Sequence, residues 1–244
     1  MKVVVNGALG KVGREVTKAV KNSKDMTLER ELDVKNDLGD YLSRNKTDVV
    51  VDFTSPEVRM KNVKAILNNG AHGVIGTTGF TEPELKEIAK LAKKVGKGII
   101  IAPNFAIGSV LLMHFAQQAA KYFDTAEIIE YHHNQKADYP SGTAIKTAQL
   151  MAEERKKFNT VLNDKVANLE GARGAEYKGI HIHSVRLPGM VAHQEVIFGE
   201  VGQYLTLRHD AVSRESYMPG VLMAIREVVK IKKLVYGLEG LMGL

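Results

Sequence analysis

The residues best suited to chemistry lie close together between positions 130 and 144, where the sequence reads EYHHNQKADYPSGTA. Two adjacent histidines, His132 and His133, are followed by Lys136. Imidazole and ammonium groups can transfer protons and can hold anions. We therefore interpret this stretch as a candidate binding site for a small acidic substrate.

The elements on either side of this stretch would position it. Residues 126–131 are predicted to form a short strand, and the apolar spacing after Thr143 predicts a helix. The histidines and the lysine would then lie in a strand-to-helix loop, where functional side chains are common. Ser141 is the predicted N-cap, and the N–H groups of Gly142 and Thr143 would offer a helix N-terminus to a carboxylate.

Each of these features also has a purely structural interpretation. A histidine pair is often exposed to solvent or satisfied by hydrogen bonds in a core. A Ser-Gly-Thr sequence before a helix is often only a cap. The occurrence of all of them in one short stretch favours the functional interpretation.

The first residues predict a dinucleotide-binding loop. An apolar strand at residues 2–6 leads directly into GALGKVG, and a helical pattern follows. Gly7 would make the tight turn, Gly10 would allow a pyrophosphate to approach, and Gly13 would let the helix pack on the strand. The spacing is G-x-x-G-x-x-G rather than the commoner G-x-G-x-x-G. The candidate contacts in this loop are Gly7, Ala8, Leu9, Gly10, Lys11 and Val12.

Asp33 supports the same interpretation. It ends the next predicted strand, about 20 residues after Gly13, where an acid accepts hydrogen bonds from the adenosine ribose. A carboxylate there favours NADH, because it repels a 2′-phosphate. Lys11 and Lys35 could compensate in part, so we expect both NADH and NADPH to be used.

Strands and helices continue to alternate through the first half of the chain. Apolar runs at residues 48–53, 71–75 and 98–102 are typical of buried parallel strands, and helical patterns lie between them. This alternation predicts an α/β class with a doubly wound, Rossmann-type parallel sheet.

The second half predicts a smaller α+β domain. A helix is expected at 107–122, followed by the loop with the histidines and by strands at 180–187, 193–199 and 203–209 in a mostly antiparallel sheet. A last helix is expected at 213–230, whereas residues 151–174 carry no informative pattern. His181 and His183 alternate along a strand without a carboxylate at a familiar spacing, so no metal site is predicted.

Composition limits the possible functions. The chain has 244 residues, no cysteine and a net charge of +6. The absence of cysteine excludes disulfides and thiol chemistry. Basic residues are spread along the chain, so no nucleic acid is expected as a partner. No apolar run approaches the length of about 20 residues that a membrane helix needs. The N-terminus is unlike a signal peptide, so a cytoplasmic location is expected.

The string HHNQKADYPSGTA resembles the signature of the dihydrodipicolinate reductase family, nicotinamide-dependent enzymes of the diaminopimelate route to lysine. The resemblance implies reduction of 4-hydroxy-tetrahydrodipicolinate, a small dicarboxylic cyclic imine, to tetrahydrodipicolinate with NADH or NADPH. It implies that Lys136 donates a proton and that His132 is the partner acid or base, a division of roles that the spacing alone leaves open. It also implies that His133, Lys136 and the amides of Ser141, Gly142 and Thr143 hold the substrate carboxylates.

The resemblance extends over most of the chain, because GTTGF and APNFAIG are similar to the cofactor loops of the family. The implied contacts with the nicotinamide end are Gly76, Thr77, Thr78, Ala102, Pro103, Asn104 and Phe105. The implied organisation is a dinucleotide-binding domain of residues 1–106 and 213–244 and a substrate-binding and oligomerisation domain of residues 107–212. The implied assembly is a homotetramer built through the sheets of the second domain.

Two other hypotheses remain open from the residues alone. The chain could be another Rossmann-type reductase, such as a hydroxy-acid or semialdehyde dehydrogenase, although the absence of cysteine excludes the thiol-dependent aldehyde class. It could also be a regulator that binds NAD without catalysis. That hypothesis gives no reason for His132, Lys136 and a helix N-terminus to occur together.

Overall fold

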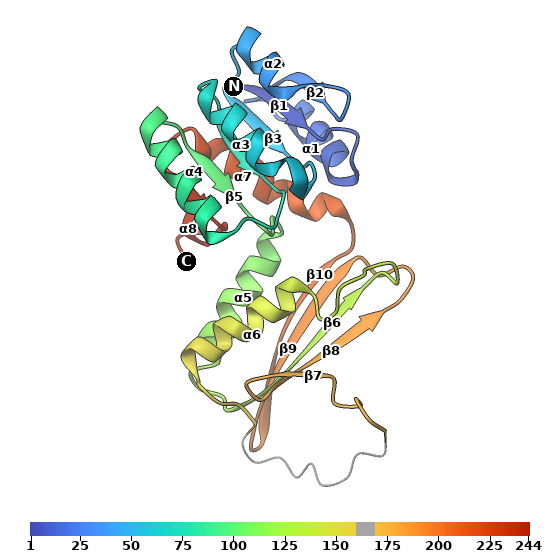
Figure 1. Cartoon of the computed structure of the whole chain (residues 1–244). Helices are drawn as coiled ribbons and strands as arrows, with labels where there is room; N and C mark the ends of the chain where they lie inside the picture. The colour runs from blue at the N-terminus through green and yellow to red at the C-terminus, as the bar shows by residue number, and fades with distance from the viewer. Residues whose placement is uncertain (160–168) are drawn as a thin grey trace. The chain divides into compact units, whose positions relative to one another are not determined.

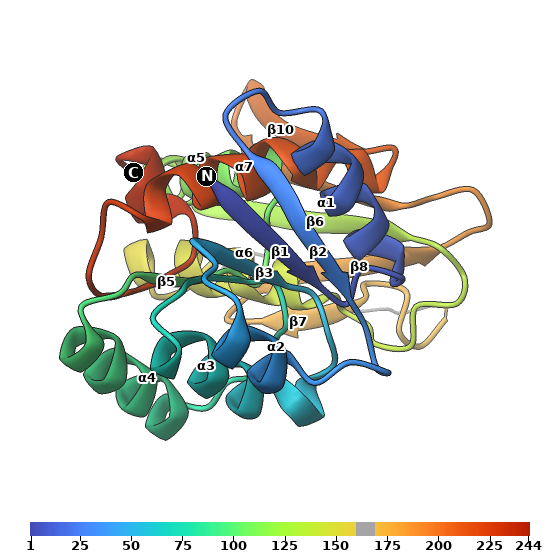
Figure 2. The ribbon, with the colours of Figure 1, turned by 90° about the horizontal axis from the view of Figure 1, so that it is seen from above.

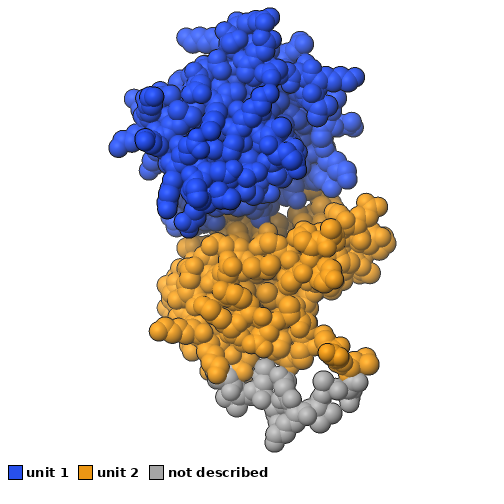
Figure 3. All heavy atoms as spheres, viewed as in Figure 1, with its two compact units in different colours: residues 1–107, 214–244 blue, residues 108–213 orange. Residues whose placement is uncertain are grey.

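The structure is a computed structural model that describes residues 1–159 and 169–244 (Figure 1). The chain divides into two compact units, coloured separately in Figure 3. The first unit comprises Met1–Ile107 and Arg214–Leu244, and the second comprises Gly108–Ser213. Part of the segment 151–174, for which the sequence carried no informative pattern, lies outside the described residues.

The first unit contains a six-stranded parallel sheet in the order β11-β5-β4-β3-β1-β2. Valine and isoleucine runs form the central strands and are fully or almost fully buried, as a parallel sheet covered on both faces requires. Figure 2 shows α1 and α7 on one face of this sheet and α2, α3 and α4 on the other. The strands are β1 (Lys2–Asn6), β2 (Thr27–Leu32), β3 (Val49–Asp52), β4 (His72–Ile75), β5 (Ile99–Ile101) and β11 (Leu234–Tyr236). The helices are α1 (Lys11–Lys21), α2 (Leu38–Arg44), α3 (Arg59–Asn68) with the short 3-10 turn η1 (Pro56–Val58) before it, α4 (Glu82–Val95), α7 (Met218–Val228) after the 3-10 turn η2 (Arg214–Tyr217), and α8 (Glu239–Met242).

This strand order creates a switch point between β1 and β3. The chain proceeds from β1 to β2 on one side and then returns to β3 on the other, so the loops after β1 and β3 open away from each other. Ligands of doubly wound sheets bind at this point, outside the carboxyl ends of the strands. Asn6 and Asp52, the last residues of the two strands, are paired in register.

The second unit contains a five-stranded sheet in the order β10-β9-β6-β8-β7. In the described part of this unit β6 and β8 run parallel, and the other neighbouring strands are antiparallel. The prediction of a mostly antiparallel sheet was therefore right except at its centre, where β6 and β8, separated in the chain by α6 and β7, form a parallel pair. The elements are α5 (Ile107–Ala119), β6 (Thr125–His132), α6 (Gly142–Glu154), β7 (Ala175–Tyr177), β8 (Ile180–Arg186), β9 (Ala192–Glu200) and β10 (Gln203–Ala211).

The core of the second unit lies between one face of the sheet and helices α5 and α6. Ala144, Ala148 and Met151 of α6 are completely buried in a cluster with Ile128 of β6 and Val196 of β9. Because side chains alternate along a strand, every second residue of β6 points toward these helices. The same alternation therefore brings the last residues of β6 toward the start of α6.

Several elements differ from the sequence-based expectations. Strand β11 was not predicted; it pairs with β5 and adds a sixth strand to the first sheet. Helix α2 was also missed, because it has only 7 residues and buries only Leu38 and Leu42. The α/β class, with a doubly wound sheet and a smaller α+β unit, is confirmed. In the residues that the structure describes, no helix has the length and apolar character needed to cross a membrane.

Candidate active site

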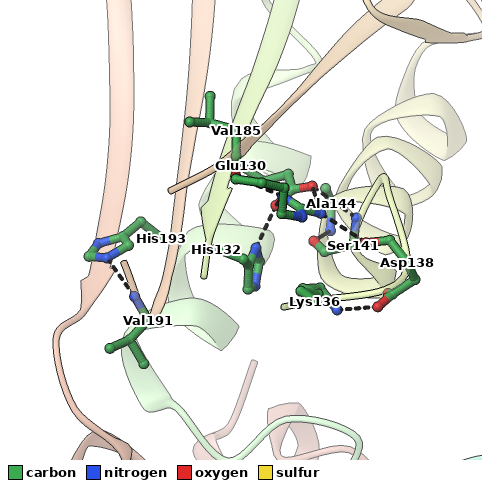
Figure 4. Close-up of polar contacts among 10 residues, drawn as sticks. Glu130, His132, Lys136, Asp138, Ser141, Ala144, Val185, Val191 and His193 are labelled. Carbon is green, nitrogen blue, oxygen red and sulfur yellow. Dashed lines mark hydrogen bonds and ion pairs between the residues drawn. The ribbon is translucent and has the colours of Figure 1, made fainter. Parts of the chain in front are cut away.

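The candidate site begins at the end of β6. His132 is the last residue of this strand, so the expectation that both histidines lie in the loop was wrong for His132. Its strand position puts its side chain on the same face of the sheet as Glu130, two residues earlier. The two side chains meet, with Nδ1 of His132 2.5 Å from Oε2 of Glu130. Figure 4 shows His132 pointing toward this carboxylate.

Glu130 is completely buried, and its carboxylate is fully engaged. The guanidinium of Arg186, at the end of β8, donates from Nη1 and Nη2 to the two carboxylate oxygens at 2.8 and 2.7 Å. The N–H of Ser141 donates to Oε1 at 3.3 Å. Burial by itself would raise the pKa of Glu130, but the hydrogen bonds from His132 and Arg186 outweigh it and lower the pKa to about 2.

This contact indicates which ring nitrogen of His132 is the donor to Glu130. A carboxylate only accepts hydrogen bonds, so the proton between the two groups belongs to Nδ1 of the imidazole. Nε2 is then the ring atom that can donate or accept a proton. A buried carboxylate that orients a histidine in this way is a common device of acid–base catalysis.

Lys136 lies in the loop and is held by a second carboxylate. Its Nζ donates to Oδ1 of Asp138 at 2.6 Å, and its backbone N–H donates to the carbonyl of His133 at 3.1 Å. Hydrogen bonding from Lys136 lowers the pKa of Asp138. Arg186 also donates to the carbonyl of Asp138 at 2.9 Å, which ties the loop to β8. Hydrogen bonds thus link His132, Glu130 and Arg186 to the backbone of Asp138, whose side chain holds Lys136.

The N-terminus of α6 completes the site. Ser141 is the N-cap, as predicted, and its hydroxyl accepts the N–H of Ala144 at 3.2 Å. Its own N–H donates to Oε1 of Glu130, so one of the three amides predicted to hold the substrate already has an acceptor within the protein. The N–H groups of Gly142 and Thr143 meet no acceptor among the described residues, and a helix N-terminus is favourable for an anion.

Sequence reasoning did not find Glu130 or Arg186 as members of the site. The alternation along residues 126–131 was a usable signal for Glu130, because it faces the same side as His132. Arg186 could not be found from local sequence. It reaches the site because β6 and β8 are parallel and His132 pairs with Arg186 in register.

The first unit carries the predicted glycine loop. Gly7 has a φ of +82°, a backbone conformation that residues with a Cβ rarely adopt. A Cβ on Gly13 would lie 2.0 Å from the carbonyl oxygen of Gly7, so α1 can begin here only with glycine at that position. Gly10 is the N-cap of α1 and has no side chain to occupy the helix N-terminus. The first N–H groups of α1 are therefore not covered by a capping side chain, and Lys11 is the first residue of the helix.

Asp33 lies beside this loop, as expected. It follows β2, and its Oδ2 accepts the N–H of Leu9 at 2.8 Å. A cavity of about 430 Å³ opens at the switch point. Its lining includes Gly7, Gly10, Asp33, Thr54 and Asn62. Val34, immediately after the acid, is 95% exposed.

The two remaining candidate loops follow β4 and β5. A Cβ on Gly76 would lie 2.1 Å from the ring of Phe53, so this glycine lets the ring pack against the backbone. Thr77 is buried and Thr78 is exposed. In the loop after β5, Ala102 and Phe105 are buried, so a ligand could reach only their backbone, whereas Pro103 is exposed. The side chain of Asn104 accepts the N–H of Ala106 at 2.9 Å.

Among the described residues, no group of three or more His, Asp and Glu side chains is placed to hold a metal ion. His183 does have a carboxylate partner that its sequence spacing did not reveal. Its Nε2 lies 2.7 Å from Oε2 of Glu127, on the neighbouring strand β6.

The fold and the site together define a class of protein. A doubly wound parallel sheet with a glycine loop and an acidic residue at its switch point is the architecture of dinucleotide-dependent enzymes. The second unit supplies a histidine and a lysine, each held by a carboxylate, beside a helix N-terminus. The first unit thus has the fold of a Rossmann-type oxidoreductase, and the second places groups that can transfer protons beside a helix N-terminus.

Comparison with known proteins identifies the family. The family models "Dihydrodipicolinate reductase, N-terminus" and "Dihydrodipicolinate reductase, C-terminus" match residues 1–105 and 108–242. The chain is 51% identical over 245 residues to the 4-hydroxy-tetrahydrodipicolinate reductase of Mycolicibacterium smegmatis, covering 100% of both. It is 48% identical to the enzyme of the same name from Listeria welshimeri, covering 99% of this chain and 100% of that one. The protein belongs to the dihydrodipicolinate reductase family.

Solved structures agree with this assignment. Dipicolinate-bound dihydrodipicolinate reductase from Paenisporosarcina sp. TG-14 has a TM-score of 0.90 with this chain and is 44% identical, covering 98% of both chains. A probable dehydrogenase from Thermotoga maritima has a TM-score of 0.64 at 13% identity, covering 99% of this chain and 93% of that one. At that identity the second likeness shows the fold alone.

Proposed function

We propose that the protein reduces 4-hydroxy-tetrahydrodipicolinate to tetrahydrodipicolinate with NADH or NADPH, in lysine biosynthesis through diaminopimelate. The observation that carries this proposal is the bonded group of His132, Glu130 and Arg186 at the N-terminus of α6. It occurs in a chain that is about half identical, over its full length, to enzymes named for this reaction.

The overall reaction has a simple balance. The 4-hydroxy group leaves as water, which gives a ring with a conjugated C=C–C=N system. When bound, the reduced nicotinamide supplies a hydride to the ring carbon remote from the imine. The enamine that results takes up one proton, so the products are tetrahydrodipicolinate, the oxidised coenzyme and water.

The second unit is proposed to hold the substrate by its two carboxylates. His133 and Lys136 provide polar and positive groups, and the N–H groups of Gly142 and Thr143 provide the helix N-terminus. The buried hydroxyl of Ser141 can still donate a hydrogen bond, although its N–H is engaged by Glu130. Both Nη atoms of Arg186 bond to the carboxylate of Glu130, so Arg186 is not assigned to a substrate carboxylate.

Proton transfer is assigned to His132 and Lys136. Lys136 is the proposed donor to the enamine, and its bond to the exposed Asp138 holds Nζ in the loop beside the N-terminus of α6. His132 is the proposed partner acid or base, acting through Nε2 while Glu130 holds Nδ1. Glu130 and Asp138 are positioning residues in this scheme.

The first unit is proposed to bind the coenzyme. The pyrophosphate would rest on the N–H groups of residues 7–12, and Asp33 would accept hydrogen bonds from the adenosine ribose. Residues 76–78 and 102–105 are the proposed contacts of the nicotinamide end. We propose that both coenzymes are used, because Asp33 favours NADH and the nearby Lys11 and Lys35 favour a phosphate.

A homotetramer is proposed from the second sheet. The face of β6 that points away from α6 carries Ile129 and Tyr131, which are only partly buried. Val185 and Ile197 lie on the same face of β8 and β9, where they alternate with the polar His183 and Glu195. Association of copies through this face would bury these side chains. A cytoplasmic location is proposed, since a chain without cysteine suits a reducing compartment.

The test is a coupled assay. Pyruvate and aspartate semialdehyde are condensed enzymatically, this protein is added, and the disappearance of reduced coenzyme is followed by absorbance. Oxidation that requires the condensation product supports the proposal. Oxidation with pyruvate alone would indicate a hydroxy-acid dehydrogenase, and coenzyme binding without oxidation would indicate a regulator. Either of these results would overturn the proposal.

A further inference from the structure

A second buried carboxylate lies in the first unit, outside the residues assigned above. Asp52 is the last residue of β3 and is only 1% exposed. It stands at the carboxyl end of the sheet, next to the switch point where the cavity opens. Buried carboxylates are rare unless they are paired or fully hydrogen-bonded, so its environment requires an explanation.

Five hydrogen bonds converge on the two oxygens of Asp52. Oδ2 accepts from the side-chain amides of Asn6 at 2.7 Å and Asn62 at 2.8 Å. Oδ1 accepts from the hydroxyl of Thr54 at 2.7 Å, from the N–H of Thr54 at 3.2 Å and from the hydroxyl of Thr77 at 3.1 Å. Among the described residues no lysine, arginine or histidine contacts it.

The direction of each bond requires an acceptor at position 52. Every neighbour donates: two amide groups, two hydroxyls and one backbone N–H. The second amide hydrogen of Asn62 goes to the hydroxyl of Thr54 at 3.1 Å, which orients that hydroxyl toward Asp52. An asparagine at position 52 would keep one acceptor oxygen but would turn an NH₂ group toward these donors. The site is therefore matched to a carboxylate and not merely to a polar residue of that size.

The partners of Asp52 come from separate cofactor loops. Asn6 immediately precedes Gly7, Thr54 follows β3, and Thr77 lies in the loop after β4. Asn62 belongs to α3, and with Asn6 and Thr54 it lines the cavity. No other described side chain bonds to all of these segments. The bonds also determine which end of each amide is left for a ligand, since Nδ2 of both asparagines is engaged and their oxygens remain available as acceptors.

We propose that Asp52 is a positioning residue for coenzyme binding, which holds the loops after β1, β3 and β4 in one arrangement and orients Asn6 and Asn62 toward the coenzyme. The inference rests on the proposed function, because it assumes that this cavity takes NADH or NADPH. Asp52 itself is enclosed by its five donors and does not touch the ligand. Its loss is expected to weaken coenzyme binding more than it slows the chemical step.

The test compares Asp52→Asn with Asp48→Asn. Asp48 precedes the same strand at its opposite end, is exposed, and accepts the N–H of Lys2 at 2.7 Å, so it controls for the loss of one carboxylate. The dissociation constant of NADH is measured by calorimetry, and kcat and KM for NADH by the coupled assay, at a temperature well below each variant's Tm. Asp52→Asn should raise the dissociation constant at least about tenfold, with a smaller change in kcat, and Asp48→Asn should stay within about twofold of the wild type.

An Asp52→Asn protein that is less stable but binds NADH as the wild type does would show a merely structural role and overturn the inference. Should this variant fail to fold, Thr54→Val removes the hydroxyl that donates to Asp52 at 2.7 Å while keeping the side-chain shape. It should raise the dissociation constant about threefold or more, and unchanged binding would overturn the inference. A wild-type protein that binds neither NADH nor NADPH would instead overturn the proposed function, and this inference with it.

Discussion

Replacing Glu130 by glutamine is the most informative perturbation of the candidate active site. The substitution keeps the size of the side chain but removes the charge that pairs with Arg186 and holds Nδ1 of His132. The new amide would direct an NH₂ group at donors of Arg186 or His132. We expect loss of stability and of activity together, for different physical reasons.

Two independent arguments give the size of the stability effect. Glu130 is completely buried and the side chain of Arg186 is 17% exposed, and removal of one partner of a buried pair costs about 3–5 kcal/mol. The fall in the pKa of Glu130 from its ordinary 4.5 to about 2 corresponds to about 3 kcal/mol of folding free energy. A loss of this size lowers Tm by about 10 °C.

The pH dependence of this loss has a definite sign. Because the folded-state pKa of Glu130 is lowered, its contribution is fully present above pH 4.5 and disappears as the pH falls from 4.5 through 2. The difference in unfolding free energy between the wild type and Glu130→Gln should therefore be largest near neutral pH and should shrink across this acidic window. Denaturant unfolding at a series of pH values measures it.

The activity should fall because His132 loses the group that orients it. We expect kcat to drop about 100-fold or more at saturating NADH, with the dissociation constant of NADH unchanged. Glu154→Gln is the matched control, since Glu154 ends the same helix α6 and, among the described residues, bonds only to Gln117 and Lys121. A Glu130→Gln enzyme with kcat within about threefold of the wild type, or with unchanged Tm, would refute the reasoning.

Further substitutions test the other assignments. Lys136→Ala should abolish most turnover, by about 100-fold or more, because it removes the proposed proton donor; calorimetry should show unchanged NADH affinity, and wild-type turnover would contradict the assignment. Asp33→Ala should raise KM for NADH about tenfold and KM for NADPH less, because only the ribose of NADH needs this acceptor; equal effects on both coenzymes in initial-rate assays would argue against it. Gly13→Ala should lower Tm and abolish coenzyme binding, because its Cβ would lie 2.0 Å from the carbonyl oxygen of Gly7; thermal unfolding would show the error if Tm were unchanged.

The first half of the molecule was largely predictable because its signals are local. Valine and isoleucine runs, a glycine loop, and a helix whose capping box at Thr81 and Glu84 is present in the structure all depend on residues near one another in the chain. The same holds for Ser141, whose capping of α6 follows from its position before an apolar helical pattern. Elements with weak local signals were missed. Strand β11 has only three residues and exists because β5 provides an edge for it.

The candidate active site was only partly predictable. His132, Lys136 and the start of α6 stand within one stretch of sequence, and their residue types suggested their chemistry. Arg186 is 56 positions from Glu130, and it reaches the carboxylate only through the parallel pairing of β6 and β8. The hydrogen bond from the N–H of Ser141 to Glu130, across 11 positions of the chain, was likewise visible only in the tertiary structure.

The sequence by itself therefore determined the class of fold, the glycine loop, the acid after β2 and the candidate residues for proton transfer, because short-range spacing and side-chain chemistry suffice for these. Only the tertiary structure decided how the charges of the site are balanced. The partners of Glu130 and Asp52 come from strands and loops distant in the chain, and a buried carboxylate is stable only where folding brings its donors together.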